Sequence, residues 1–275
     1  MMIDDSLQNS LRERHNPDGS VLRAAQMRML EILVAVDGIC RREGIGYWMD
    51  AGTLLGAVRH GGFIPWDDDL DICILKKDYK RFKAAMLSGL PSNLAYQDWT
   101  TDPCHFEMAL RIRDLDSLFD QEESRLQRWR GLFLDVVLLE KMPSMRFHNF
   151  LYPLYGRVTR TLHNQGLVEG KPRARVAVEK AAAYALWPLA QLLRLGGALV
   201  AALHGSDLVG RYYSGFRNPR HLGNVFPLKD IEFEGIPFKA PADADAYLKD
   251  LFGDYGALPP ESQRGGHEVK IELYR

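Results

Sequence analysis

Hydrophobic residues between Val21 and Arg42 recur every three or four positions, which is the spacing of one face of a helix. They are Leu22, Met27, Met29, Leu30, Ile32, Leu33, Val36 and Ile39. Gly44 follows this segment, at a position typical of a helix end. The pattern therefore predicts one amphipathic helix over residues 21–42.

After Gly44 the chain changes to short apolar runs that are separated by turn residues. The run YWMD predicts a strand, and the following Ala51, Gly52 and Thr53 form a tight turn into a helix that ends near Arg59. Later apolar runs predict further strands. In all, we expect strands over residues 47–50, 69–75, 107–114 and 132–140, and a helix over residues 78–86.

The stretch YALWPLAQLLRLGGALVAALH, residues 184–204, is mostly apolar but contains Pro188, Arg194, Gly196 and Gly197. A membrane-spanning helix needs about 20 predominantly apolar residues, so these interruptions disfavour spanning. The stretch favours a buried helical hairpin, and attachment to a membrane interface stays as the alternative.

Farther along, FEGIPFKAP resembles a hairpin turn, and ADADAYLKDLFGDYG predicts a helix that ends near Gly253. Strands mixed with helices and short connections predict an α+β fold with an added helical segment. We expect an N-terminal helix and α+β core over residues 1–140, a basic and then apolar helical insertion over 141–220, and a C-terminal segment over 221–275 that packs on the core.

Composition narrows the class of protein. The 275 residues are 46% hydrophobic, and 35 Lys and Arg balance 36 Asp and Glu, so no excess of positive charge indicates a nucleic-acid partner. Cys40, Cys73 and Cys104 form no CxxC pair and fit reduced thiols. The N-terminus lacks the basic and apolar regions of a signal peptide. A cytoplasmic location is therefore expected.

Positive charge is concentrated locally. Residues 141–180 hold eight Lys or Arg against Glu169 and Glu179, a net charge of +6. With the apolar stretch that follows, this predicts a peripheral contact with the cytoplasmic face of a membrane. The alternative is that the arginines bind an anionic acceptor or lie in solvent.

The run WDDDLD, residues 66–71, places four carboxylates in six positions. In a strand Asp69 and Asp71 project on the same side, with Cα atoms about 7 Å apart. A divalent cation would keep both ionised and use them as hard oxygen ligands. The run therefore indicates a metal site, and a solvated acidic turn is the alternative.

Two further features bear on this site. Gly52 and Thr53 begin a helix, where free N–H groups favour a phosphate, although capping explains them equally well. Asp135 interrupts the apolar run LFLDVVLL. It is a candidate third ligand, or the partner of Arg111 or Arg113 in a salt bridge.

The run YWMDAGTLLGAVRHGGFIPWDDDLDICI, residues 47–74, resembles the signature of LicD-type phosphotransferases, a family related to fukutin-type ribitol-phosphate transferases. GLFLDVVLLE resembles the family's second acidic strand, although it lacks the expected proline and aromatic residue. YLKDLFGDYGALPPESQRGGH resembles the family's C-terminal segment. The resemblance implies a nucleotidyltransferase-like mixed sheet flanked by helices.

The resemblance also implies the chemistry. Mg²⁺, or Mn²⁺ in its place, and a CDP-alcohol donor are expected, with CDP-choline as the first choice. The metal ligands would be Asp69, Asp71 and Asp135, and Asp67 or Asp50 is the candidate base. The donor would be contacted by Gly52, Thr53, Arg59, His60 and His267.

We therefore expect transfer of phosphocholine to a hydroxyl of a cell-surface glycan or its lipid-linked precursor, with CMP as the leaving group. Ribitol phosphate or glycerol phosphate could be transferred by the same chemistry, because no residue identifies the alcohol. Aromatic residues that could form a cage around a quaternary ammonium are Tyr47, Trp48, Trp66, Tyr96 and Trp99. A non-catalytic glycan-binding or membrane-surface scaffold is the alternative from another class.

Overall fold

A computed structural model describes residues 3–105, 109–166, 169–212, 218, 220–265 and 270–274. Its helices are α1 (Asp5–His15), α2 (Val21–Glu43), α3 (Ala51–His60), α4 (Tyr79–Gly89), α5 (Met145–His163), α6 (Arg173–Leu203), α7 (Leu222–Val225) and α8 (Ala244–Phe252). Its strands are β1 (Tyr47–Met49), β2 (Asp71–Leu75), β3 (Leu94–Gln97), β4 (Ala109–Asp114), β5 (Ser117–Asp120), β6 (Phe133–Lys141), β7 (Leu208–Arg211), β8 (Arg220–His221), β9 (Lys229–Phe233), β10 (Ile236–Ala240) and β11 (Lys270–Leu273). Short 3₁₀ turns lie at Lys76–Asp78, Glu122–Ser124 and Glu261–Gln263.

The central sheet is mixed, with strand order β1-β2-β6-β4-β3, and β7 and β8 extend it beside β6. Strands β2 and β6 are parallel, and their register sets Asp71 opposite Asp135. The other neighbours are antiparallel, and β4 sets Arg111 opposite Asp135. The expected α+β class and mixed sheet flanked by helices are confirmed.

Helices α2 and α4 cover one face of this sheet. Tyr47 of β1, whose strand partner is Ile74, donates a hydrogen bond to Asp37 of α2. Tyr96 of β3 and Tyr79 of α4 both donate hydrogen bonds to Asp98. On this face the strands present fully buried apolar residues such as Ile72. Because side chains alternate along a strand, Asp71, Asp135 and Arg111 project from the opposite face.

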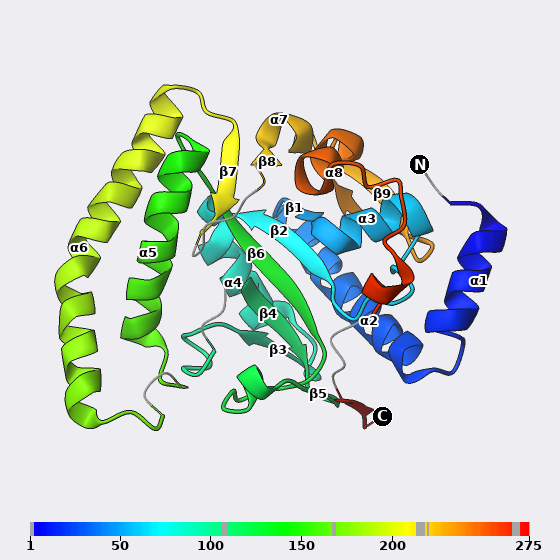
Figure 1. Ribbon diagram of the computed structural model, residues 1–275, viewed down its shortest axis with the longest axis horizontal. Helices are drawn as coiled ribbons and strands as arrows, with labels where there is room; N and C mark the ends of the chain where they lie inside the picture. Colours follow the sequence, from blue (N-terminus) through cyan, green and yellow to red (C-terminus); the bar gives the residue numbers. More distant parts are fainter. Residues whose placement is uncertain are drawn as a thin grey trace.

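The apolar stretch after residue 184 lies within one continuous helix, α6, and the expected hairpin within it is wrong. The chain turns before residue 173, and α6 runs beside α5 at the edge of the molecule (Figure 1). Gly197 lies within this continuous helix and faces the ring of Phe147 in α5. A Cβ at Gly197 would lie 2.3 Å from that ring. By length and composition α6 could cross a membrane.

The C-terminal part returns to the core. The expected hairpin forms from β9 and β10, and the expected helix, α8, ends at Phe252 before Gly253 in the left-handed region. Tyr247 of α8 accepts a hydrogen bond from the indole of Trp48 at 3.1 Å. Both side chains are fully buried, so α8 is part of the core around β1.

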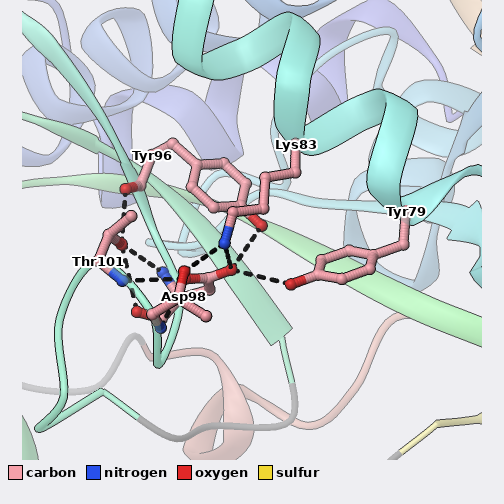
Figure 2. A network of polar contacts seen from close by, with 6 residues as sticks. Tyr79, Lys83, Tyr96, Asp98 and Thr101 are labelled. Carbon is pink, nitrogen blue, oxygen red and sulfur yellow. Dashed lines mark hydrogen bonds and ion pairs between the residues drawn. The ribbon is translucent and has the colours of Figure 1, made fainter.

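Asp98 fastens α4 to the end of β3 (Figure 2). Its Oδ2 accepts hydrogen bonds from the hydroxyls of Tyr79 and Tyr96 and from the Lys83 ammonium, at 2.8 to 3.0 Å. Burial opposes the charge of Asp98, but the hydrogen bonds from Lys83 and Thr100 outweigh it and lower the pKa to about 2. The ionised carboxylate therefore stabilises the folded state.

We predict that Asp98→Asn lowers the free energy of unfolding at pH 7 by about 2 kcal/mol. Because the folded-state pKa is depressed, this stability is present above the unfolded pKa near 4 and is lost as the pH falls toward 2. Urea denaturation of both proteins between pH 7 and pH 2.5 measures the difference. Asp18→Asn, whose side chain is 95% exposed, is the control and should change stability by less than about 0.5 kcal/mol. A difference that persists unchanged at pH 2.5 would contradict the prediction.

Candidate active site

Acidic residues gather where β2 begins. Asp67, Asp69 and Asp71 are partly exposed, whereas Asp68 and Leu70 between them are buried. This alternation is that of an extended chain with one accessible side, as the sequence predicts. Asp71 lies opposite Asp135 in the parallel ladder, so the carboxylates share one end and one face of the sheet.

The acids repel one another. The pKa of Asp71 is raised well above its usual value by burial, and then by the charges of Asp69, Asp135 and Asp50. The pKa of Asp67 is raised in the same way, by burial and by the charges of Asp69 and Asp68. A cation bound beside these side chains would therefore favour their ionised forms.

The turn between β1 and α3 is tied to these acids. The backbone N–H of Asp50 donates to the carbonyl of Asp71 at 3.1 Å, and the N–H of Asp71 donates to the Thr53 hydroxyl at 2.8 Å. A Cβ at Gly52 would lie 3.0 Å from Asp67 Oδ2. Ala51 has φ of 42°, which is strained for a residue with a side chain. The structure thus brings Gly52 and Thr53 to the acids, with Thr53 bracing the start of β2.

Asp135 is held by Arg111. The Nε of Arg111 donates to Asp135 Oδ1 at 2.7 Å, and the guanidinium lies 4.0 Å from the centre of the Phe133 ring. This is one of the salt bridges that the sequence left open as the alternative to a third metal ligand. In the described part of the chain, no three His, Cys, Asp or Glu side chains are grouped as a metal would require. The donor chemistry of Asp69 and Asp71 fits a hard divalent cation, whereas Asp135 is engaged by a cation of the protein.

Asp50 belongs to a buried network behind the acids. Arg220 binds both of its carboxylate oxygens, at 3.1 and 2.6 Å, and the Tyr247 hydroxyl donates to Oδ1 at 2.7 Å. Burial works to raise the pKa of Asp50, but Arg220 and Tyr247 outweigh it and lower the pKa. Asp50 is fully buried, so it holds the fold around the site and is out of reach of an acceptor hydroxyl. Sequence reasoning missed Arg220, which lies in a run of loop-like residues.

The other predicted donor contacts lie elsewhere. Arg59 is at the far end of α3, about 12 Å from Ala51 by helix rise, and its Nη1 donates to the carbonyls of Tyr255 and Ala257. His60 is buried against Gln8, and burial followed by the charge of Arg59 lowers its pKa to about 3. The contacts of Arg59 are thus with the C-terminal segment, and the His60 ring also packs edge-on against Trp66, the residue before the acidic run. His267 lies outside the described residues.

The aromatic residues considered for a cage are separated. Tyr47 donates to Asp37, Tyr96 donates to Asp98, and Trp48 donates to Tyr247. Trp66 packs edge-on against His15 and His60, and Trp99 lies 4.2 Å from the His163 ring. These five side chains therefore have different partners and do not form one cage.

The sequence was compared with known proteins. Residues 44–150 match the nucleotidyltransferase domain of the LicD/FKTN/FKRP family. This range includes the turn at Gly52, the acidic run and Asp135. Over this domain the chain resembles the LicD family. It is a family of phosphotransferases, and the acids gathered at β2 and β6 lie within its shared domain.

Two relatives show how far the likeness extends. The lipopolysaccharide cholinephosphotransferase LicD of Haemophilus influenzae is 25% identical over 264 residues, which cover 90% of this chain and 96% of that protein. The human ribitol 5-phosphate transferase FKRP is 49% identical over 43 residues, 16% of this chain and 9% of its own length. The match with LicD thus includes α5 and α6, whereas the match with FKRP covers a short segment of the chain.

We predict that Asp71→Asn raises the free energy of unfolding of the metal-free protein by about 1 kcal/mol at pH 8, because it removes a charge directly opposite Asp135. The pKa of Asp71 is raised, so the folded state favours its protonated form and loses stability as the pH rises above the unfolded pKa. Wild type and variant should therefore converge near pH 4. Urea titrations in EDTA at both pH values test this, and a destabilised variant at pH 8 would contradict it.

We also predict that Arg220→Met lowers the free energy of unfolding by about 3 kcal/mol, because it leaves the Asp50 carboxylate buried without its ion pair. The double variant with Asp50→Asn should recover most of this loss. A double-mutant cycle in urea measures the coupling between the two residues. If the losses of free energy in the two single variants simply add in the double variant, the ion pair contributes nothing to stability beyond the packing of its side chains.

Proposed function

We propose that the chain transfers a phospho-alcohol, with phosphocholine as the first choice, from a CDP-linked donor to a hydroxyl of a cell-surface glycan or its lipid-linked precursor. The observation that carries this proposal is the acidic cluster of Asp67, Asp69 and Asp71 opposite Asp135, in a domain of the LicD family. The choice of phosphocholine is supported by the name of the relative that aligns over 96% of its own length.

The acids suit a divalent cation, Mg²⁺ or Mn²⁺, which Asp69 and Asp71 would hold. Such an ion would neutralise charge on the diphosphate of the donor. Arg111 would keep Asp135 oriented beside it and add positive charge to the same face of the sheet. At the N-terminus of α3, Gly52 leaves room for the Asp67 carboxylate, whose Oδ2 would lie 3.0 Å from a Cβ there. The N–H groups of this first helical turn would suit contact with a phosphate.

Asp67 is the proposed base. It is partly exposed, and hydrogen bonding to Asp69 contributes to its raised pKa. In the reaction the acceptor oxygen would bond to phosphorus, the bond from phosphorus to CMP would break, and the hydroxyl proton would pass to Asp67. Asp50 is excluded from this role by its ion pair with Arg220.

Transfer of ribitol phosphate is the second candidate, favoured by the 49% identity with the human FKRP segment. The separated aromatic residues give no preference for choline. A cytoplasmic location is also part of the proposal, because Cys40, Cys73 and Cys104 are free thiols. A non-catalytic scaffold is distinguished from both enzymes by the absence of turnover.

We expect CMP release from CDP-choline only when a divalent cation and an acceptor glycan are present. CDP-ribitol and CDP-glycerol, tested in parallel, identify the alcohol. Asp69→Asn should lower kcat at least about 1,000-fold without loss of folding, because charge on the donor would no longer be neutralised. Asp18→Asn is the matched control and should keep full activity.

Near-wild-type turnover by Asp69→Asn would contradict the metal assignment. Turnover in EDTA would contradict the need for a cation, and release of CMP from no CDP-alcohol would leave the scaffold as the better account. Thermal stabilisation by CDP-choline should likewise require the cation, because the carboxylates otherwise repel the diphosphate.

A further inference from the structure

Helix α6 has its polarity reversed relative to a helix on the surface of a soluble protein. From Ala181 to Leu203, no exposed residue carries a charge. Its two strongly polar side chains, Gln191 and Arg194, both point into the protein. A surface helix normally turns its apolar side inward and its charged side to water.

The outward side of α6 is a leucine surface. Large apolar residues with exposed fractions from 42% to 75% are Tyr184, Leu186, Leu189, Leu192, Leu193, Leu195, Leu199, Val200 and Leu203. The buried positions of the helix hold only small residues, Ala183, Ala190, Gly197 and Ala201. An exposed apolar surface that is continuous over several helical turns marks a site of contact with a partner or a membrane.

The inward side of α6 is fixed to the enzyme. Arg194 forms an ion pair with Glu140 of β6 at 2.6 Å, and Gln191 donates to the Tyr155 hydroxyl of α5 at 3.1 Å. Phe147 of α5 fills the space above Gly197. In this structure α6 can therefore meet a membrane with one side only, as a helix that lies in the interface and does not cross it.

Helix α5 continues the leucine surface. Phe150 and Leu154 follow Phe147 by three and seven residues, so they share the side of α5 that carries Phe147 to α6. Phe150 is 75% exposed and Leu154 is 40% exposed. We call these two residues, together with the exposed apolar residues of α6, the hairpin surface.

Charge identifies the partner. Residues 145–203 contain eight Lys or Arg and two Glu, a net charge of +6, so the rest of the chain carries −7 within a total of −1. Arg157 and Arg160 of α5 and Arg173 of α6 are exposed. A second copy of the chain would bring one positive hairpin against another. An anionic lipid surface is complementary both to the arginines and to the leucines.

The order of residues along α6 agrees with this partner. Arg173, Arg175 and Lys180 come first, the aromatic residues Tyr184 and Trp187 follow, and the leucines come last. Trp187 is 38% exposed. In a helix that lies along the interface, basic side chains and the rings of Tyr and Trp stay at the level of the headgroups, and the leucines of the outward side face the acyl chains.

We propose that the hairpin surface binds the interface of an anionic bilayer, with α6 lying along the membrane and the catalytic sheet held beside it. The binding needs neither donor nor acceptor, so it is separate from the proposed catalytic function.

Flotation of the full chain with vesicles tests the proposal. We expect binding to vesicles that contain phosphatidylglycerol, weaker binding to pure phosphatidylcholine, and release as salt is raised. Leu192→Glu with Leu199→Glu should lower the partition coefficient at least tenfold. Leu87→Glu on α4 is the matched control, because Leu87 is 58% exposed and lies outside the hairpin. Arg157→Gln with Arg160→Gln should weaken binding to anionic vesicles about fivefold for each arginine.

Quenching by lipids with brominated acyl chains gives a second readout. Fluorescence of the wild type should be quenched in anionic vesicles, and Trp187→Phe should remove most of the quenching. Failure to bind anionic vesicles at low salt would overturn the proposal. A stable dimer in solution that the leucine double variant converts to monomers, without any vesicle binding, would assign the hairpin surface to a second copy.

Discussion

Repulsion among carboxylates dominates one end of the central sheet, and the surrounding structure is arranged to contain it. Two arginines supply the internal compensation, Arg111 from β4 for Asp135 and Arg220 from β8 for Asp50. Asp67, Asp69 and Asp71 are left as the partly exposed acids, and their mutual charge raises the pKa of Asp67 and Asp71. A cation bound there, as we propose, would relieve this repulsion, and its binding would then be coupled to the stability of the sheet.

The sequence was informative where local pattern determines structure. The periodicity of residues 21–42 predicted α2, and the apolar run after Asp71 predicted β2, which begins at Asp71, two residues later than expected. Short strands without a strong pattern were missed, such as β5, whose partner β11 lies about 150 residues later. Arg59 and His60 were expected to contact the donor, but in the structure Arg59 binds carbonyls of the C-terminal segment and His60 is buried against Gln8 and Trp66. The pairing of Asp50 with Arg220 depends on tertiary packing across 170 residues, and no local signal encodes it.

Helix α6 shows a different limit of sequence reasoning. A run of leucine and alanine has the same composition whether it faces a protein core or a lipid, so the pattern alone favoured burial. What distinguishes the two is the direction of the few polar residues, and only the fold reveals that Gln191 and Arg194 point inward. In this run Gly197 allows close packing of two helices at Phe147, Gly196 has open space beside it, and neither marks a turn.

The ion pair between Asp50 and Arg220 also constrains when the protein can become active during its synthesis. Asp50 leaves the ribosome early and is buried directly beside Asp71, whereas Arg220 and Tyr247 emerge about 170 and 200 residues later. Until they arrive, Asp50 cannot be buried with its native partners. The acidic end of the sheet is therefore completed only after α5 and α6 have been translated, so the segment proposed to bind the membrane is made before the proposed active site is complete.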